Sequence, residues 1–90
     1  MKQITIDCAG IPTAPEFHQA IAAAMEFPDY YGKNLDALMD CLTEIGEDLE
    51  LILLSWHKLE CNLKDYSGKL LSVFQCACQE NSRLSVTIHP

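Results

Sequence analysis

The chain has 90 residues, of which 49% are hydrophobic and 21% are charged, and its formal net charge is −7. This length and composition predict one small domain spanning residues 1–90, with enough apolar side chains for a packed core, and they argue against a disordered chain. The acidity is concentrated: residues 29–50 hold seven acids and one base (net −6), which leaves six acids and five bases (net −1) elsewhere. Such a surface would repel the phosphates of nucleic acid and attract a basic protein.

The first part of the chain predicts a strand followed by a helix. Polar and apolar residues alternate over residues 2–8, which indicates a half-buried strand. Thr13 and Glu16 are spaced as in a capping box, with a proline in the first turn, and apolar residues follow at helical spacing as far as Met25. Pro28 bars continuation of this helix, so we expect a loop there.

A second helix is predicted over residues 34–45, after a loop that includes residues 29–33. Asn34 is suited to cap the first turn of this helix, and Gly46 is expected to end it. Between them, a stripe of apolar residues recurs at helical spacing and should face the core. The stripe consists of Leu35, Leu38, Leu42 and Ile45.

The second half of the chain predicts a strand, two helices and a final strand. Residues 49–54 form a nearly continuous apolar run, typical of a strand covered by its neighbours. A short helix is expected over residues 56–63, and a longer one runs from residue 65 or 66 to residue 79. Residues 84–89 alternate again, which indicates a second half-buried strand. The aromatic residues near the start of the two helices, Trp56 and Tyr66, are expected to join the core.

This order of elements, with three strands separated by pairs of helices, predicts the fold class. Helical crossovers between strands favour a parallel sheet built from right-handed units. Because the middle strand is continuously apolar and the other two alternate, the middle strand should be central, in the order 1-2-3. We therefore expect a two-layer α/β fold with helices mainly on one face of a three-stranded parallel sheet.

Hydropathy and cysteine content bear on the compartment in which the protein works. No run of about 18 apolar residues is present, and the first residues lack the long apolar stretch of a signal peptide, so we expect a cytoplasmic protein without a membrane span. The number of cysteines is odd and their spacing matches no zinc site, which favours reduced and mostly buried thiols. The cysteines are Cys8, Cys41, Cys61, Cys76 and Cys78.

Three acids of the predicted second helix, Asp36, Asp40 and Glu44, follow one another at intervals of four residues. On a helix such like charges are neighbours, and each pair destabilises it by about 0.2–0.5 kcal/mol. A solvated polar face is the ordinary explanation for such a row. Two features favour a binding surface instead: no lysine or arginine stands at the compensating positions, and the row begins beside the aromatic turn at residues 30–32.

The segment PDYYGKNLDALMDCLTE, residues 28–44, resembles the signature of the barstar family, the intracellular inhibitors of small secreted ribonucleases such as barnase. The resemblance covers nearly the whole chain, with a short insertion before the second strand. It includes Trp56 after that strand and Val73-Phe74 in the last helix. The core of the match is Pro28, Tyr30, Tyr31, Gly32, Asn34, Leu35, Asp36, Ala37, Leu38 and Asp40, and it extends to Leu42 and Thr43.

The resemblance implies a parallel three-stranded sheet with packed helices, and it implies a mode of action. In this family the second helix and the loop before it plug the active site of the ribonuclease. Asp40 would be the central mimic of an RNA phosphate, with Asp36 beside it, and Tyr30 would cover a ring in the cleft of the enzyme. The residues expected to contact the partner are Tyr30, Gly32, Asn34, Leu35, Asp36, Met39, Asp40, Glu44, Cys76 and Glu80.

Three positions depart from the family pattern. Met39 stands where the best-known member has tryptophan, and Lys33 replaces an acid in the loop. Cys76 replaces a glutamate that supports binding, although Glu80 remains one turn later. We expect Cys76 to be a partly buried edge residue, with an exposed interface or redox-sensitive thiol as the alternative. The departures predict a cognate ribonuclease different from the best-known one.

The sequence thus predicts a ribonuclease inhibitor that binds one small basic secreted ribonuclease 1:1, needs no cofactor or metal, catalyses no reaction and is monomeric when free. One alternative is an immunity protein, or antitoxin, for another basic toxin or nuclease. An enzyme is a third possibility, with Cys61 and His57 as a Cys-His pair or with Asp36 and Asp40 as ligands of a divalent cation. It is the least favoured, because the pair lacks a third orienting group and two carboxylates alone hold magnesium weakly.

Overall fold

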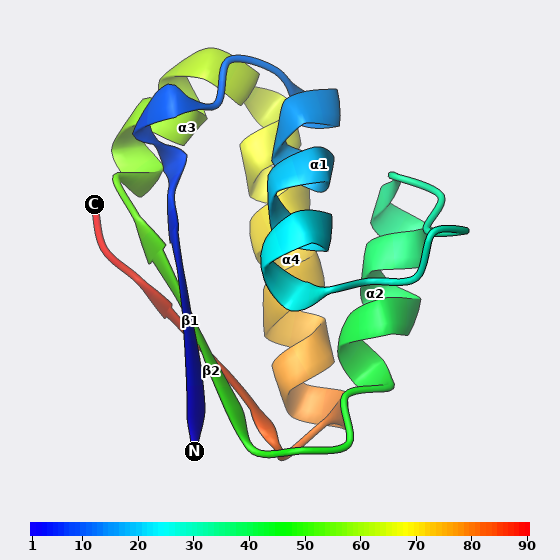
Figure 1. Cartoon of the computed structure of the whole chain (residues 1–90). Coiled ribbons are helices and arrows are strands. Elements are labelled where there is room, and N and C mark those ends of the chain that lie inside the picture. The colour runs from blue at the N-terminus through cyan, green and yellow to red at the C-terminus, as the bar shows by residue number, and fades with distance from the viewer.

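The computed structural model describes residues 1–90 as one sheet of three strands with helices packed against it (Figure 1). The strands are parallel and lie in the order β1-β2-β3, so the predicted topology and the central place of the middle strand are confirmed. None of the helices is long and apolar enough to cross a membrane. The elements are β1 (Lys2–Asp7), the short 3-10 helix η1 (Cys8–Gly10), α1 (Ala14–Met25), α2 (Leu35–Thr43), β2 (Leu49–Leu54), α3 (Trp56–Leu63), α4 (Asp65–Glu80) and β3 (Leu84–Ile88).

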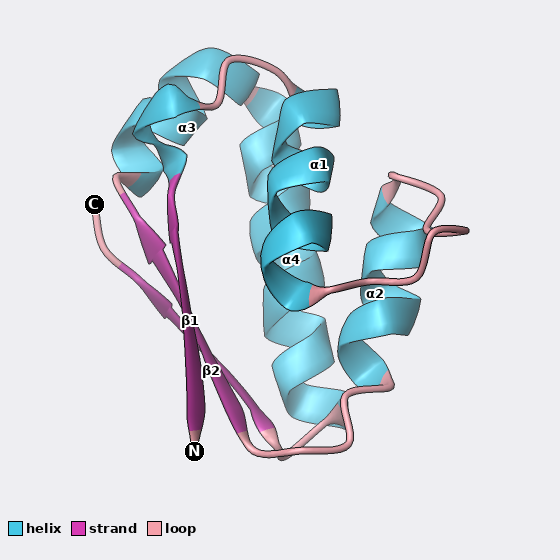
Figure 2. Cartoon of the chain, viewed as in Figure 1, coloured by secondary structure: helices cyan, strands magenta, loops and turns pink.

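α1, α2 and α4 form the second layer on one side of the sheet, and α3 lies across the end of the sheet, beside η1 (Figure 2). Ile4, Leu51 and Val86 are partners in register across the three strands. Along β2, residues 49, 51 and 53 are buried, whereas residues 50, 52 and 54 are half-buried. The apolar run of β2 is therefore fully buried on one face of the sheet only. On the other face, side chains of the neighbouring strands, such as Gln3 and Thr87, shield β2 in part.

The core is formed by apolar residues from every strand and every α-helix. Phe17 of α1 contacts Phe74 of α4 edge-on, and Phe74 in turn contacts Trp56, which is buried as predicted. The largest fully buried side chains are Phe17, Phe74, Ile21, Leu38, Leu42, Leu51, Leu53, Leu59, Leu70, His18 and Cys8. This core fixes α1, α2 and α4 relative to one another, and so fixes the loop between α1 and α2.

The structure corrects three local predictions at the ends of elements. Cys8 belongs to η1 rather than to the first strand. The predicted capping box does not form, because the Thr13 side chain caps no backbone N–H and its hydroxyl lies 3.4 Å from a carboxylate oxygen of Glu16. The second helix ends at Thr43 rather than at Gly46, which has no positive φ angle. Other elements begin and end within about two residues of their predicted limits.

Candidate partner-binding surface

The loop between α1 and α2, residues 26–34, is fixed to the start of α2 by Asn34. The Asn34 side chain accepts a hydrogen bond from the Ala37 backbone N–H (2.8 Å), which confirms the predicted cap, and it donates one to the Gly32 carbonyl oxygen (3.2 Å). A Cβ atom at Gly32 would lie 3.1 Å from the Asn34 amide nitrogen, so a larger residue would push against the cap. Between them, Lys33 adopts a left-handed backbone conformation with φ of 54°.

The two tyrosines of this loop have opposite environments. Tyr30 is 86% exposed, whereas Tyr31 is only 8% exposed. The Tyr31 ring contacts the ring of Phe27, and its hydroxyl lies 2.6 Å from Nδ1 of His18 in α1. Burial raises the pKa of Tyr31, so its phenol stays neutral at physiological pH. Tyr31 therefore anchors the loop, and the neighbouring Tyr30 ring projects into solvent.

The three carboxylates of the acidic row, Asp36, Asp40 and Glu44, are all exposed along α2. Glu44 is the residue that caps the C-terminus of α2, and its backbone N–H donates to the Asp40 carbonyl oxygen. The ion pairs in the structure join Lys2 to Glu47 and Arg83 to Asp48, and neither involves the row. The negative charges of the row affect the neighbouring Cys41. Burial raises the pKa of the Cys41 thiol, and the charges of Glu44 and Asp40 raise it further.

Two hollows on this surface bring most of the predicted binding residues together. The loop hollow, of about 420 Å³, lies between the α1–α2 loop and α2. The interhelix hollow, of about 280 Å³, lies between α2 and α4. The loop hollow is lined by Pro28, Tyr30, Tyr31, Gly32, Asn34, Ala37, Asp40, Cys41 and Glu44, and the interhelix hollow by Leu35, Asp36, Met39, Ser72, Val73 and Cys76.

The two predicted residues on α4 have different positions relative to these hollows. Cys76 lines the interhelix hollow and is exposed, so the prediction of a partly buried edge position is wrong. α2 packs against α4, and Cys76 borders the hollow that stays open between these two helices. Glu80, the last residue of α4, is exposed and lines neither hollow.

The sequence did not identify the buried side chains that hold the α1–α2 loop in place. His18, Tyr31 and Tyr66 form a hydrogen-bonded group, with Nε2 of His18 lying 2.7 Å from the Tyr66 hydroxyl. Tyr66 was expected to join the core, but it is only half-buried and packs against the core, and it lines a small hollow with Asn34, Leu35 and Asp36. A histidine within an otherwise apolar helix face was the available signal, because such a residue needs hydrogen-bond partners when buried.

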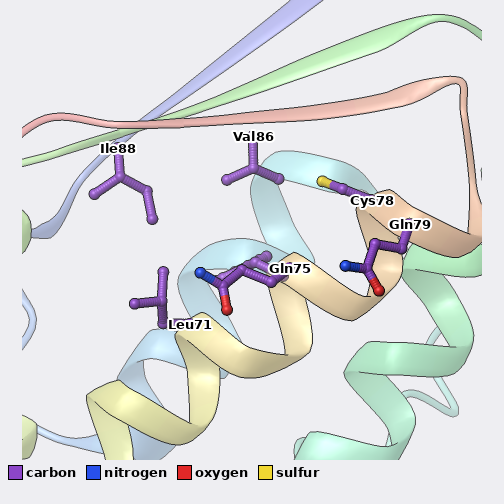
Figure 3. Close-up of a pocket in the computed structure, with 7 residues that line it drawn as sticks. Leu71, Gln75, Cys78, Gln79, Val86 and Ile88 are labelled. Atoms are coloured by element: carbon purple, nitrogen blue, oxygen red, sulfur yellow. The ribbon is translucent and has the colours of Figure 1, made fainter.

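The largest hollow of the molecule, about 610 Å³, lies elsewhere, between α4 and β3 (Figure 3). Leu71, Val86 and Ile88 give it an apolar lining, and the side-chain amides of Gln75 and Gln79 also face it (Figure 3). It contains none of the predicted binding residues and no charged side chain.

The cysteines are all free, and their exposure differs from the prediction. Cys8 is buried and Cys41 and Cys78 are half-buried, but Cys61 and Cys76 are exposed. Cys61 Sγ lies 3.9 Å from Nε2 of His57 on the exposed side of α3. No group of three or more His, Cys, Asp or Glu side chains is arranged to hold a metal ion.

Comparison with known proteins agrees with this architecture. Residues 1–89 match the family described as "Barstar (barnase inhibitor)". The chain is also 37% identical over 81 residues to a Bacillus subtilis (strain 168) protein named "Putative ribonuclease inhibitor YrdF", and the match covers 89% of each chain. The chain belongs to the barstar family.

Proposed function

We propose that the protein inhibits a small basic ribonuclease by inserting α2 and the α1–α2 loop into its active site, in a 1:1 complex. The observation that carries this proposal is the acidic row: Asp36, Asp40 and Glu44 are exposed, follow one another along one helix, and have no cationic partner within the molecule. Membership of the barstar family and the relative named "Putative ribonuclease inhibitor YrdF" support it.

Carboxylates can occupy a site built for phosphate because both groups are anions with several hydrogen-bond acceptors. Arginine and lysine side chains that bind an RNA phosphate would bind the carboxylates of Asp40 and Asp36 through charge-assisted hydrogen bonds. The mutual repulsion along the row would be relieved when the cationic cleft surrounds it. The protein would then act by occupying the cleft, with no chemistry and no cofactor of its own.

Tyr30 would supply the apolar part of the contact. Its ring is 86% exposed, yet it stands beside the firmly anchored Tyr31, so it can be presented with little loss of conformational freedom. Tyrosine is among the residues that contribute most to binding free energy in protein interfaces. The loop hollow between Tyr30 and Asp40 would receive a protruding side chain from the wall of the cleft.

The direct test is titration of a barnase-like ribonuclease with this protein, measured by residual RNA cleavage. We expect the activity to fall linearly to an end point at one equivalent, and the association rate to fall as salt is added. The variant Asp40→Asn removes one charge from the row with almost no change in shape. Glu60→Gln is the matched control, because it removes one exposed charge from α3, which contributes nothing to the proposed surface.

Loss of inhibition in Asp40→Asn together with full inhibition by Glu60→Gln would support the proposed surface. Equal inhibition by both variants would contradict it. Absence of any inhibition by the folded wild-type protein, with barnase-like ribonucleases of differing cleft charge, would overturn the proposed function itself.

A further inference from the structure

The outer side of β3 is an open edge of the sheet. β3 pairs with β2 alone, and no further strand lies beyond it. The carbonyl oxygen of Arg83 and the backbone N–H of His89 both form hydrogen bonds with β2. Because the direction of these groups repeats at every second residue of a strand, residues 85 and 87 also face β2. The backbone groups of Leu84, Val86 and Ile88 therefore point outward.

Most of these outward groups have no partner in the protein. The N–H of Val86 reaches the Cys78 thiol, a weak acceptor: burial raises the pKa of Cys78, and the hydrogen bond from the Val86 backbone offsets part of that rise. No backbone group of another segment pairs with the Ile88 N–H or with the carbonyl oxygens of Val86 and Ile88. The end of the chain turns away from the edge, because the carbonyl oxygens of His89 and Pro90 accept hydrogen bonds from the start of α3.

The largest hollow of the molecule borders this open edge. The side chains of Val86 and Ile88 point from β3 towards α4, where Leu71 and Gln75 face them (Figure 3). The hollow measures about 610 Å³ and has no charged side chain in its lining. An added strand would complete such a site, since its backbone would pair with the free edge and alternate side chains would enter the hollow.

The charge of the protein restricts where two copies of it can meet. Each copy has a net charge of −7, so two copies repel each other and can associate only through surfaces that carry little charge. The other edge strand, β1, contains Lys2 and Asp7, and charged residues protect an edge strand from pairing with another chain. β3 has the sequence LSVTI, which is uncharged and rich in the β-branched residues that favour strand pairing.

The edge of β3 is also complementary to itself. A two-fold axis that relates two copies brings their identical edges together as antiparallel strands. Leu84, Val86 and Ile88 of one copy would then exchange backbone hydrogen bonds with the same residues of the other. Because the side chains of these residues face the helix layer in both copies, each copy would extend apolar cover over the hollow of the other.

We propose that β3 is a self-association edge, through which two copies of the protein pair in antiparallel and join their three-stranded sheets into one continuous sheet. The proposal does not depend on ribonuclease inhibition, because the hollow contains no residue of α2 or of the α1–α2 loop. A single strand edge is small beside the roughly 1,200–2,000 Å² of a stable interface, so we expect a dissociation constant between about 10 μM and 1 mM. The monomer expected from the sequence is then the form at low concentration.

Sedimentation equilibrium from about 5 μM to about 2 mM protein covers the expected range of dissociation constants. A reducing agent is needed so that the exposed Cys61 and Cys76 cannot link copies by disulfides. We expect the average mass to rise from 10.1 kDa towards twice that value. Added salt should strengthen the association, because it screens the repulsion between the two acidic copies.

Two variants with the same added charge locate the contact. Gln75→Glu places a carboxylate at the hollow with little change in shape, and we expect it to weaken association by at least about tenfold. Gln19→Glu is the matched control, because Gln19 is exposed on α1 and lines a different hollow. It should weaken association by less than about threefold. Equal weakening by the two variants would overturn the inference.

Hydrogen exchange of single backbone amides, followed by NMR, tests the pairing itself. The N–H of Ile88 points outward and should exchange quickly in dilute protein and slowly in concentrated protein. The N–H of Thr87 faces β2 and should be protected at both concentrations. Association without added protection of Ile88 would overturn the inference, because the copies would then meet through another surface. A wild-type protein that keeps the mass of one chain up to about 2 mM would also overturn it and leave the edge to a strand of another protein.

Discussion

The side-chain amide of Asn81 donates a hydrogen bond to the carbonyl oxygen of Leu42 over 3.0 Å, across 39 positions of sequence. The same amide also donates to the carbonyl oxygen of Ile45 at 3.0 Å, and the Asn81 side-chain oxygen accepts from the backbone N–H of Arg83. Asn81 lies immediately after α4 and is buried. It therefore satisfies the backbone where α2 ends and holds that end against α4.

We expect Asn81→Ala to lower the free energy of unfolding by about 1–3 kcal/mol, because the part-buried Ile45 carbonyl oxygen loses its side-chain donor and the Leu42 carbonyl oxygen keeps only its long backbone contacts. Urea denaturation monitored by circular dichroism would measure the loss. Ser82→Ala is the control, since this exposed neighbour forms no side-chain hydrogen bond and should change stability by less than about 0.5 kcal/mol. Equal stability of the two variants would show that water replaces the Asn81 contacts without cost.

Stability should also depend on pH through His18. Its ordinary pKa is 6.5, which applies to the unfolded chain, and burial lowers it in the folded protein. Below pH 6.5 the unfolded chain therefore binds more protons than the folded one, and stability falls as pH decreases from 6.5 to the folded pKa. Well above pH 6.5 neither state binds this proton, so the contribution of His18 becomes constant there.

Urea midpoints measured across this interval would show the effect. Wild type should lose stability steadily below pH 6.5, and His18→Gln should lose less over the same interval although it starts lower. Parallel curves for the two proteins would mean that His18 ionises equally easily in the folded and unfolded states, contrary to its burial.

Much of the fold could be predicted because its signals are local. Alternation in residues 2–8, the apolar run of residues 49–54 and helical spacing elsewhere each depend on neighbours a few positions apart. Asn34 as a cap is a relation across three residues, and it is confirmed at 2.8 Å. The parallel topology followed because helical crossovers connect consecutive strands.

The features that could not be predicted depend on tertiary contacts. The bonds of His18 to Tyr31 and Tyr66 span 13 and 48 positions, and nothing in the local pattern pairs these side chains. The early end of α2 has the same kind of cause, because the hydrogen bonds from Asn81 satisfy the Leu42 and Ile45 carbonyl oxygens without a further helical turn. The acidic row was visible in the sequence, but its lack of internal cationic partners required the structure.

The thiols should divide into two classes by their reactivity. Burial, reinforced by the charge of Asp7, raises the pKa of Cys8 to about 11, and burial also raises the pKa of Cys41 and Cys78. Because the thiolate is the reactive form, these three should be alkylated slowly at neutral pH. Cys61 and Cys76, which are exposed, should react quickly. Mass spectrometry after brief treatment with iodoacetamide would resolve the two classes.

Repeating the alkylation in the presence of an inhibited ribonuclease would locate the interface. Cys76 borders the interhelix hollow beside Asp36, so the proposed complex should protect it. Cys61 on α3 provides an internal control and should keep its rate. Protection of Cys61 with Cys76 still reactive would place the partner on the wrong side of the molecule for the proposed mechanism.

The acidic row should lower the free energy of unfolding of the free protein, although it is needed to inhibit the ribonuclease. In Asp40→Lys, the new ammonium group stands four residues from both Asp36 and Glu44, so two repulsive pairs become attractive. We expect the free energy of unfolding to rise by about 0.8–2 kcal/mol at low salt, because each of the two pairs changes from about 0.2–0.5 kcal/mol of repulsion to a similar attraction, and the gain should shrink as salt is added. The same variant should no longer inhibit the ribonuclease, because a cation would face the cationic cleft. A variant that is both less stable and fully inhibitory would contradict the idea that the row serves to bind an external partner.

Asp40→Asn removes the repulsion without adding an attraction. Its stability should therefore lie between those of wild type and Asp40→Lys, and urea denaturation alone can check this order.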